Sequence, residues 1–520
     1  MADIVLINPK FEISFWGLSE ALPFLRKRCA IPTSALPLLA ALTPREHQVT
    51  LIDENVEPID FDRCARADIV GVSGMVVQRG RMREILVELK KRGAYVVVGG
   101  PWITVNETYF GDLVDVAFIG EAEETWPRFL SDWQQGKTAA RYEQAEKTDM
   151  TRVPAPRLDL LKMNRYAFGS VQFSRGCPFE CEFCDIIVVF GRRPRLKTPQ
   201  QIIAELEDLR RYGMPMVFIV DDNLIGNKKA IKVLLRHVIA WQEENGYPLS
   251  FMTEASIDLA DDPELMELMA KANVGSVFVG IESTNESSLR EVKKLQNIRR
   301  GGTIAEKIGR IQKADIEVFG GLIVGFDNDD ESVFANHRHF ADAARLSIAM
   351  VGMLSAIPKT PLYKRLAAEG RLDESDELKY GTNVTPAQMS RERLSRGYVD
   401  LMGELYEPQA FFERLDALFV EQRIVLDNGW QKYAAQHPWK RRGRHFGFWL
   451  QAYGLMGALM LGVRDPSLRR IYFRQFRQFM RTRPTAVMAR AYALRCAIHF
   501  HMHQLVRVLR SGDRALLNTY

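Results

Sequence analysis

The chain has 520 residues, which is enough for about three domains. Hydrophobic residues make up 47% of it, an ordinary share for globular proteins with sizeable cores, which argues against a disordered or fibrous chain. The formal net charge of +5 indicates no partner by itself, but the positive excess is concentrated near the C-terminus. The opening residues MADIVLINPKFE are typical of a strand, so we expect no secretory peptide.

Residues 1–135 alternate short apolar runs with helical stretches. The runs begin at Ile4, Val49, Ile69, Tyr95 and Val116. Continuous apolar runs separated by helices predict a buried parallel sheet, here a doubly wound domain. Open α/β sheets bind ligands at the carboxyl ends of their strands. Candidate ligand-lining residues at these ends are Ser73, Gly74, Met75, Gly99, Gly100, Pro101, Gly120 and Glu121. No GxGxxG follows the first run, so a dinucleotide site is not predicted.

Residues 136–169 are predicted to be a linker, because the segment around Pro154 and Pro156 is polar and lacks clear periodicity.

Residues 173–184 read FSRGCPFECEFC, which places Cys177, Cys181 and Cys184 in a CxxxCxxC spacing. Thiolates suit iron–sulfur clusters or zinc. Three ligands would leave one iron of a four-iron cluster open to a substrate or cosubstrate. Zinc sites usually need a second pair of ligands, and the other cysteines are isolated, so a cluster is favoured over zinc or a structural role. Six cysteines do not form a disulfide framework in such a chain, and a reducible cluster predicts a cytoplasmic setting.

Residues 170–380 contain six strand–helix units, which predict a (β/α)6 partial barrel. The active site of such a barrel lies at the carboxyl ends of its strands. Asp222, Glu254 and Glu282 lie at or near three of these ends, and Gly321 and Gly325 frame a fourth strand. The alternatives are that the carboxylates cap helices or face solvent, and that the glycines only permit tight turns.

Residues 381–520 are predicted to form an all-helical region. After Pro438 the chain has fifteen Arg and one Lys against two Asp. A basic amphipathic helix is predicted where arginines and aromatic residues recur at helical spacing, at Arg470, Tyr472, Phe473, Arg474, Phe476, Arg477, Phe479 and Arg481. Such a helix can contact an anionic membrane or an acidic partner, and the alternative is a solvated basic face over an ordinary core. No nucleic-acid motif accompanies the charge, so no nucleic-acid partner is expected.

Two further features of this region carry predictions. The apolar run from Phe446 to Val463 is short for a membrane-spanning helix, and it fits a buried or interfacial helix better. His499, His501 and His503 are expected to be surface or capping residues rather than metal ligands, because no carboxylate accompanies them.

The cysteine motif, with an aromatic residue before its last cysteine, resembles the radical S-adenosylmethionine (SAM) superfamily. The resemblance extends through the predicted barrel, where GIES ends one strand and GLIVG lies in the next. It implies that the three cysteines of the motif hold a [4Fe-4S] cluster whose open iron chelates SAM. It also implies that Glu282 binds the ribose or methionine end of SAM, with Asp222 and Glu254 in the same site. The backbone from Gly321 to Gly325 would meet the adenine.

Residues 1–135 resemble the cobalamin-binding domain that precedes many radical SAM barrels, so the eight strand-end residues given above would line the corrin and its nucleotide tail. Two departures stand out. The DxHxxG signature that supplies histidine to cobalt is missing from the loop Asn8–Ile13, and Trp102 replaces the histidine of GGxH. The first departure favours cobalamin bound without that ligand, and the alternative is a domain that binds nothing.

The C-terminal helices resemble an extension found in hopanoid methylases of this branch. Together these resemblances imply a cobalamin-dependent methyltransferase that acts at an unactivated carbon. A 5′-deoxyadenosyl radical would activate the substrate, methylcobalamin would donate the methyl group, and an external donor would supply electrons. The alternatives are a radical SAM cyclase or rearrangement enzyme, or a cluster-bearing redox sensor. The expected substrate is a small or lipid-like molecule, and the expected location is cytoplasmic, with peripheral contact to the inner membrane face as an option.

Overall fold

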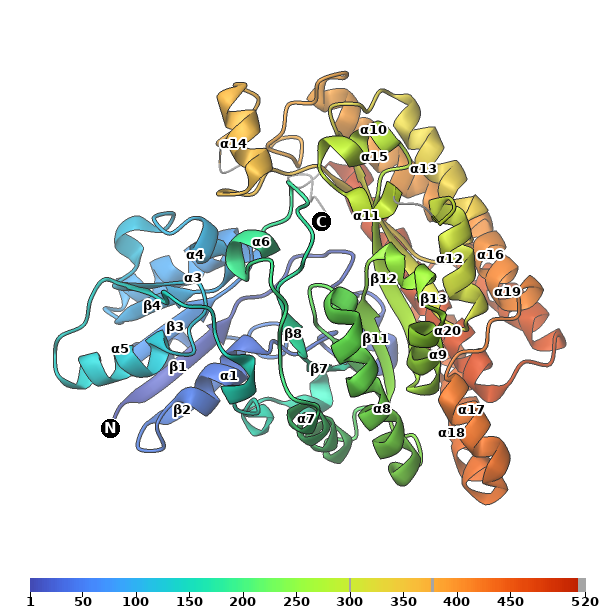
Figure 1. Ribbon diagram of the computed structural model, residues 1–520, viewed down its shortest axis with the longest axis horizontal. Helices are drawn as coiled ribbons and strands as arrows, with labels where there is room; N and C mark the ends of the chain where they lie inside the picture. The colour runs from blue at the N-terminus through green and yellow to red at the C-terminus, as the bar shows by residue number, and fades with distance from the viewer. Residues whose placement is uncertain (299–300, 376–377, 513–520) are drawn as a thin grey trace.

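The structure is a computed structural model that describes residues 1–298, 301–375 and 378–512 (Figure 1). It contains two six-stranded sheets followed by a set of long helices. The first sheet lies on the left of Figure 1 in blue, and the second lies nearer the centre in green. The mixed α/β class with parallel sheets and a helical C-terminal region, as predicted, is confirmed.

The first sheet is parallel throughout and has the strand order β2-β1-β3-β4-β5-β6. Its strands are β1 (Asp3–Asn8), β2 (Gln48–Asp53), β3 (Ile69–Ser73), β4 (Val96–Gly99), β5 (Val116–Ile119) and β6 (Arg141–Glu143). Its helices are α1 (Ala35–Leu42), α2 (Phe61–Ala65), α3 (Arg79–Lys91), α4 (Pro101–Val105) and α5 (Thr125–Gln134). Strand β6 lies in the segment predicted as a linker. Its single buried side chain, Tyr142, is too short a pattern to indicate a strand.

The second sheet is also parallel, and its strands follow chain order from one edge to the other, as β7-β10-β11-β12-β13-β14. The strands are β7 (Gly169–Val171), β10 (Met216–Ile219), β11 (Ser250–Glu254), β12 (Val274–Glu282), β13 (Glu317–Val324) and β14 (Ala349–Met353). The main connecting helices are α7 (Pro199–Arg211), α8 (Lys228–Asn245), α9 (Pro263–Lys271), α12 (Ile304–Lys313) and α13 (Ser332–Ala343). Asp262 caps α9 by accepting from the N–H of Leu265, as the Asp-Pro pair predicts.

The C-terminal region is helical. The prediction extended to residue 520, and residues 513–520 lie outside the described residues. The helices of this region are α15 (Arg391–Leu405), α16 (Pro408–Asp416), α17 (Asn428–Gln436), α18 (Pro438–Gly462), α19 (Pro466–Arg481) and α20 (Ala486–Ser511), and α14 (Pro361–Ala368) precedes them. A buried ion pair between Arg495 on α20 and Glu317 on β13 joins these helices to the second sheet. Within the described residues, we find no helix with the length and apolarity needed to cross a membrane.

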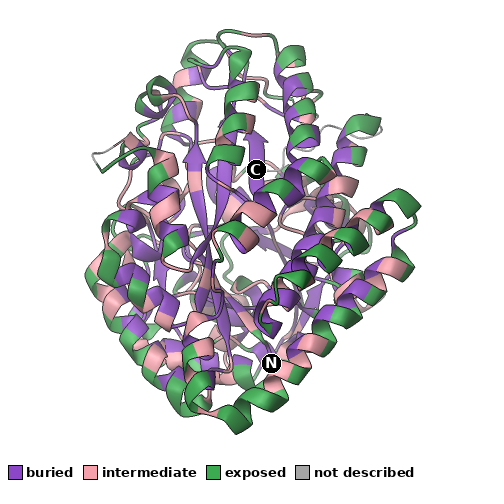
Figure 2. Cartoon of the chain, turned by 90° about the vertical axis from the view of Figure 1, so that its right-hand side faces the viewer, coloured by how far each residue is buried: buried purple, intermediate pink, exposed green. Residues whose placement is uncertain are grey.

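Burial follows the layering of sheets and helices (Figure 2). The strands are largely buried, while the outer faces of the surrounding helices are exposed. Two of the three C-terminal histidines are also buried, which corrects the surface expectation for His499 and His501. The ring of His499 contacts the hydroxyl of Tyr472 at 2.8 Å and the carbonyl of Tyr406 at 3.1 Å, because it lies between packed helices.

Candidate active site

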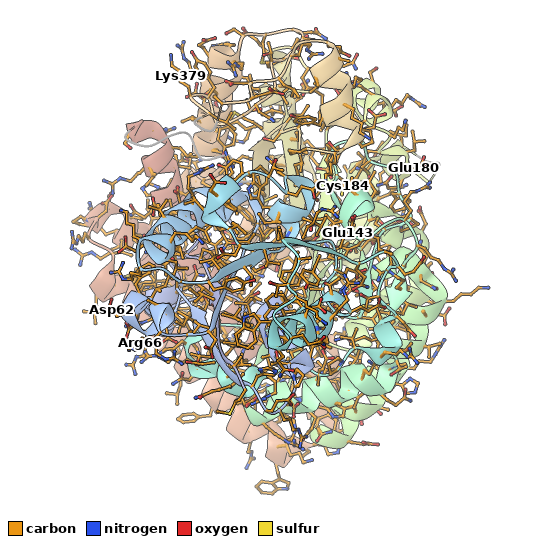
Figure 3. The ribbon with its side chains drawn as sticks, turned by 90° about the vertical axis from the view of Figure 1, so that its left-hand side faces the viewer. Asp62, Arg66, Glu143, Glu180, Cys184 and Lys379 are labelled. Atoms are coloured by element: carbon orange, nitrogen blue, oxygen red, sulfur yellow. The ribbon has the colours of Figure 1, made fainter. Side chains whose placement is uncertain are left out.

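The cysteine motif forms a loop between two short elements, β8 (Ser174–Arg175) and α6 (Ile186–Val189). Figure 3 labels Cys184 in this loop. The N–H of Cys177 donates to the carbonyl of Gly191, at 3.3 Å, and the N–H of Cys184 donates to the carbonyl of Cys181, at 3.2 Å. Gly176 has φ +95°, and an added Cβ there would lie 2.8 Å from the carbonyl oxygen of Gly191. The loop therefore requires glycine immediately before its first cysteine.

Two amide side chains point toward the thiols of this loop. The Nδ2 of Asn223 lies 3.9 Å from the Sγ of Cys177, and the Nε2 of Gln296 lies 3.6 Å from the Sγ of Cys181. Burial raises the pKa of the Cys177 and Cys184 thiols, so a positive group is needed to hold them as thiolates. Within the described residues, no three His, Cys, Asp or Glu side chains are arranged to share one metal ion.

Carboxylates from neighbouring strands meet at the same end of the second sheet. Asp222 follows β10 and accepts from the N–H of Gly176, at 2.7 Å. Burial raises the pKa of Asp222 to about 7. Burial, together with the charges of Asp222 and Glu282, raises the pKa of Glu254 to about 8. The three predicted carboxylates are thus brought together, and perturbed carboxyl groups in such a position are typical of functional sites.

Glu282 forms a buried ion pair with Lys294, with 2.7 Å between Oε1 and Nζ. Glu282 has φ +64°, and the pairing of β12 with β13 is irregular between Gly280 and Glu282. A non-glycine residue in this conformation is strained, which is typical of functional positions. Burial alone lowers the pKa of Lys294, but the adjacent charge of Glu282 raises it, so the lysine stays charged. Its Nζ lies 5.9 Å from the ring centre of Phe183, within the cysteine loop.

Three buried oxygens beside this ion pair have no hydrogen-bond partner within the described residues: Oε2 of Glu282, Oε1 of Gln296 and Oδ1 of Asn297. Gln296 and Asn297 lie on the short helix α11 (Leu295–Ile298). Unpaired buried acceptors are costly, and a ligand that supplies N–H or O–H donors would satisfy them. Lys294, Gln296 and Asn297 were not predicted from the sequence. Their only signal was the polar run KKLQN after GIES.

The two predicted glycines, Gly321 on β13 and Gly325 just after it, lie at positions that disfavour a larger side chain. A Cβ on Gly321 would lie 2.7 Å from the ring of Phe278. Gly325 has φ +105°, and its N–H donates to the carboxylate of Asp329, at 3.0 Å. Crowding by Phe278 therefore explains the glycine at position 321, and the positive φ explains the glycine at position 325. A contact between these glycines and a ligand stays a prediction.

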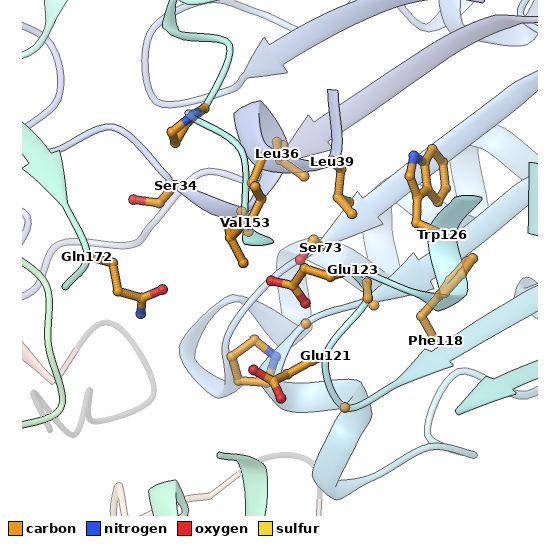
Figure 4. Close-up of a pocket in the computed structure, with 18 of the residues that line it drawn as sticks. Ser34, Leu36, Leu39, Ser73, Phe118, Glu121, Glu123, Trp126, Val153 and Gln172 are labelled. Carbon is orange, nitrogen blue, oxygen red and sulfur yellow. The ribbon is translucent and has the colours of Figure 1, made fainter. Parts of the chain in front are cut away.

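A cavity lies at the carboxyl edge of the first sheet and has a volume of about 240 Å³ (Figure 4). Six of the eight residues predicted there line it: Ser73, Gly99, Gly100, Pro101, Gly120 and Glu121. Gly74 and Met75 are not among its lining residues. The opposite wall comes from Ser170, Val171 and Gln172 of the second sheet region, so the cavity lies between the two sheets.

A buried group of four charges joins this cavity to the cysteine loop. Arg175, two residues before Cys177, contacts Glu121 at 2.8 Å and Glu123 at 2.6 Å. Arg195, on the strand that pairs with β8, contacts Glu121 at 2.9 Å. Although burial alone raises the pKa of Glu121, Arg175 holds it below its ordinary value. Both flanks of the cysteine loop are therefore tied to the loop after β5.

Family models match two parts of the chain. The radical SAM superfamily matches residues 171–341, and a domain of unknown function matches residues 360–515. An uncharacterized methyltransferase of Synechocystis sp. is 38% identical over 470 residues, covering 87% of this chain and 87% of the relative. The hopanoid C-2 methylase of Rhodopseudomonas palustris is 34% identical over 418 residues, covering 79% and 78% of the two chains.

Two solved structures share the fold. The radical SAM methyltransferase TsrM from Kitasatospora setae has a TM-score of 0.57 and 18% identity, covering 72% of this chain and 77% of its own. The cobalamin-dependent radical SAM enzyme OxsB has a TM-score of 0.59 and 15% identity, covering 98% of this chain and 80% of its own. At these identities the likeness concerns the fold alone. The matched superfamily and the two sequence relatives carry the assignment: the chain belongs to the radical SAM superfamily, in the group of methyltransferases that includes hopanoid C-2 methylase.

Proposed function

We propose that the protein methylates an unactivated carbon of a small or lipid-like substrate with a [4Fe-4S] cluster, SAM and cobalamin as its cofactors. The observation that carries the proposal is the meeting of the cysteine loop, the Glu282–Lys294 pair and three unpaired buried acceptors at one end of the second sheet. When bound, the cluster and SAM supply a 5′-deoxyadenosyl radical, and methylcobalamin supplies the methyl group. The protein places these groups and excludes water.

Cys177, Cys181 and Cys184 would ligate the cluster. Asn223 and Gln296 then donate to two of the ligating sulfurs, an arrangement that tunes the reduction potential of such clusters.

The unpaired oxygens of Glu282, Gln296 and Asn297 would accept from SAM. SAM carries donors of the required kind in its ammonium group, its ribose hydroxyls and its adenine amine. Lys294 holds the Glu282 carboxylate in place. The backbone around Gly321 and Gly325 is the proposed adenine contact.

The cavity of the first sheet suits one end of cobalamin. A volume of about 240 Å³ accommodates a flat heterocyclic base such as that of the nucleotide tail, but not the whole corrin. Glycine backbone, apolar side chains and the rings of Phe118 and Trp126 line it. The corrin would then lie at the mouth, near the half-exposed Met75.

We propose three domains. The cobalamin-binding domain comprises residues 1–135 together with β6, the radical SAM domain comprises residues 170–380, and the helical domain comprises residues 381–520.

The two positions where related domains carry a histidine support the binding of cobalamin without a protein histidine. Gln78 closes the loop after β1 by donating to Asn8 and to the carbonyl of Pro9. Trp102, on α4, is buried, and its ring meets that of Tyr109 edge to face. Neither position presents a nitrogen ligand to the mouth of the cavity.

Anaerobic reconstitution with iron, sulfide and cobalamin, followed by SAM and reductant, tests the radical chemistry. We expect 5′-deoxyadenosine by mass spectrometry from the native chain and none from Cys177→Ala. Lys294→Met should retain its cluster, seen by absorbance, and lose most of the product, whereas the exposed Lys293→Met should retain both. Product from Cys177→Ala, or none from a native chain carrying its cluster, would contradict the proposal.

Two other functions remain as outcomes of the same assay once a substrate is supplied. A gain of one methylene in the product supports methyl transfer, and a product without that gain indicates cyclisation or rearrangement. Absence of deoxyadenosine from a cluster-loaded chain would favour the redox-sensor alternative.

A further inference from the structure

Helix α18 carries a stripe of apolar side chains on its outer surface. The exposed large hydrophobic residues of this helix are Trp439, Phe446, Leu450, Tyr453 and Leu461, of which Leu461 is 89% and Trp439 is 81% exposed. From Phe446 to Leu461 these residues follow the helical period, so they share one side of the helix. At a rise of about 1.5 Å per residue, the stripe from Trp439 to Leu461 is about 33 Å long.

Glycines in the same helix show that this side is uncovered. A Cβ built on Gly443, Gly447, Gly454 or Gly457 would have no neighbour within 4 Å. The opposite side of α18 is buried and packs along α20, through Phe448, Ala452, Leu455, Met456 and Leu459. The fold therefore already uses the inner side as its core, and the outer stripe needs another explanation. Exposed apolar surfaces of this kind mark interaction sites.

Positive charge surrounds the stripe. Lys440, Arg441 and Arg442 are exposed at the start of α18, and Arg464 is exposed just after its end. Helix α19 adds an exposed row of arginines, at Arg470, Arg474, Arg477 and Arg481. Between residues 428 and 512 the only carboxylate side chain in the sequence is that of Asp465, which caps α19.

From the sequence, two interpretations of α19 were open, contact with an anionic membrane or acidic partner and a solvated basic face over an ordinary core, and the structure favours the second. Three of the four aromatic residues predicted there, Tyr472, Phe476 and Phe479, are buried against neighbouring helices, and only Phe473 is exposed. The aromatic face of α19 is therefore core, and its arginines form a solvated basic face. The apolar surface open to a partner belongs to α18, on the right-hand side of Figure 1.

We propose that this face of α18, with its basic surroundings, docks on the surface of an anionic lipid bilayer. An interfacial helix inserts apolar side chains by about 5–10 Å while Lys and Arg contact acidic headgroups. A second copy of the chain fits poorly, because a two-fold contact would bring two basic surroundings face to face. This surface lies outside the reaction site, so the docking proposal can be tested independently of the proposed chemistry.

Vesicle co-sedimentation of the full chain tests the docking. The vesicles contain either phosphatidylcholine alone or phosphatidylcholine with one third phosphatidylglycerol. Leu450→Glu/Leu461→Glu places charge in the stripe, and Arg441→Gln/Arg442→Gln reduces its basic surroundings. The control is Val233→Glu, which adds one carboxylate, half the charge of the stripe variant, at an exposed apolar residue of α8. Circular dichroism establishes that each variant is folded.

We expect binding to phosphatidylglycerol vesicles that weakens with salt, falls by about tenfold or more in both α18 variants and is unchanged in Val233→Glu. As a second readout, bound vesicles should slow amide hydrogen exchange in residues 439–461 of the native chain. Failure of the native chain to bind these vesicles would overturn the proposal, and so would undiminished binding by the stripe variant. Sedimentation velocity that shows a dimer in the native chain and a monomer in the stripe variant would assign the face to a second copy instead.

Discussion

Replacing Arg175 by methionine would break the charge group that ties the cysteine loop to the first sheet. Arg175 is buried and contacts both Glu121 and Glu123, at 2.8 and 2.6 Å. In Arg175→Met, Glu121 keeps Arg195 as its cation. Among the described residues, the partner left to Glu123 is the hydroxyl of Thr148, which donates to it at 3.1 Å. The substitution therefore leaves one carboxylate buried without an opposite charge.

The cost follows from the burial of these groups. Removing one partner of a buried ion pair typically destabilises a protein by ~3–5 kcal/mol, because the remaining charge is uncompensated. The double variant Arg175→Met/Glu123→Gln removes both charges, so most of that loss should be regained. Arg192→Met is the matched control in the same loop. Arg192 pairs with Glu180 at the surface, where both side chains are more than half exposed, and such pairs contribute about 0–1 kcal/mol.

Thermal unfolding by circular dichroism and equilibrium dialysis against hydroxocobalamin measure the two consequences. Arg175→Met should unfold several degrees lower than the native chain and bind cobalamin more weakly, since Glu121 and Glu123 line the cavity. The double variant should recover much of the thermal stability. If Arg175→Met unfolds at the native temperature, or if the double variant is no more stable than the single one, the reasoning about buried charge is refuted.

Two further predictions concern a glycine and a histidine. A Cβ on Gly280 would overlap the Glu282–Lys294 pair, so Gly280→Ala should weaken SAM binding to the reconstituted protein by about tenfold or more in calorimetry. Gly309→Ala on α12 is the control, because an added Cβ there meets nothing within 4 Å. It should leave SAM binding unchanged and add up to ~1 kcal/mol of stability. Equal SAM binding by both variants would contradict the placement of SAM beside the Glu282–Lys294 pair. Burial lowers the pKa of His499 from 6.5 to about 3, so the folded state keeps the ring neutral where the unfolded chain protonates it. Its contribution to stability is complete above pH 6.5 and declines as the pH falls toward 3, by about 2 kcal/mol at pH 5. His499→Phe should therefore lose less thermal stability than the native chain between pH 7 and 5, and an identical loss would exclude this histidine as a cause.

Much of the sheet structure was predictable because local pattern determines it. Continuous apolar runs marked the buried strands, and the polar residues at their ends, such as Asp222 and Glu282, had to share one edge of a parallel sheet. The cysteine spacing identified the loop for the same reason, since its chemistry is local in sequence.

The remaining features depend on contacts between distant segments. Lys294 is an ordinary lysine in sequence, and only the path of the chain after β12, through the short helix α10 (Glu286–Glu291), brings it back to Glu282. The contact between Arg175 and Glu121 joins residues 54 positions apart across two sheets. The aromatic pattern of α19 was ambiguous because a core face and a membrane face have the same periodicity, and only the packing of neighbouring helices distinguishes them.

The central claim is methylation through methylcobalamin. This requires that SAM first supplies the methyl group to bound cobalamin, and that step can be measured without knowing the substrate. The reconstituted, reduced protein is incubated with SAM whose methyl group carries deuterium, and the bound cobalamin is then extracted and examined by mass spectrometry. We predict methylcobalamin that carries the label, formed only in the presence of the protein. Cobalamin that stays bound but unlabelled, in protein that cleaves SAM to 5′-deoxyadenosine, would contradict methyl transfer and leave a non-methylating radical reaction.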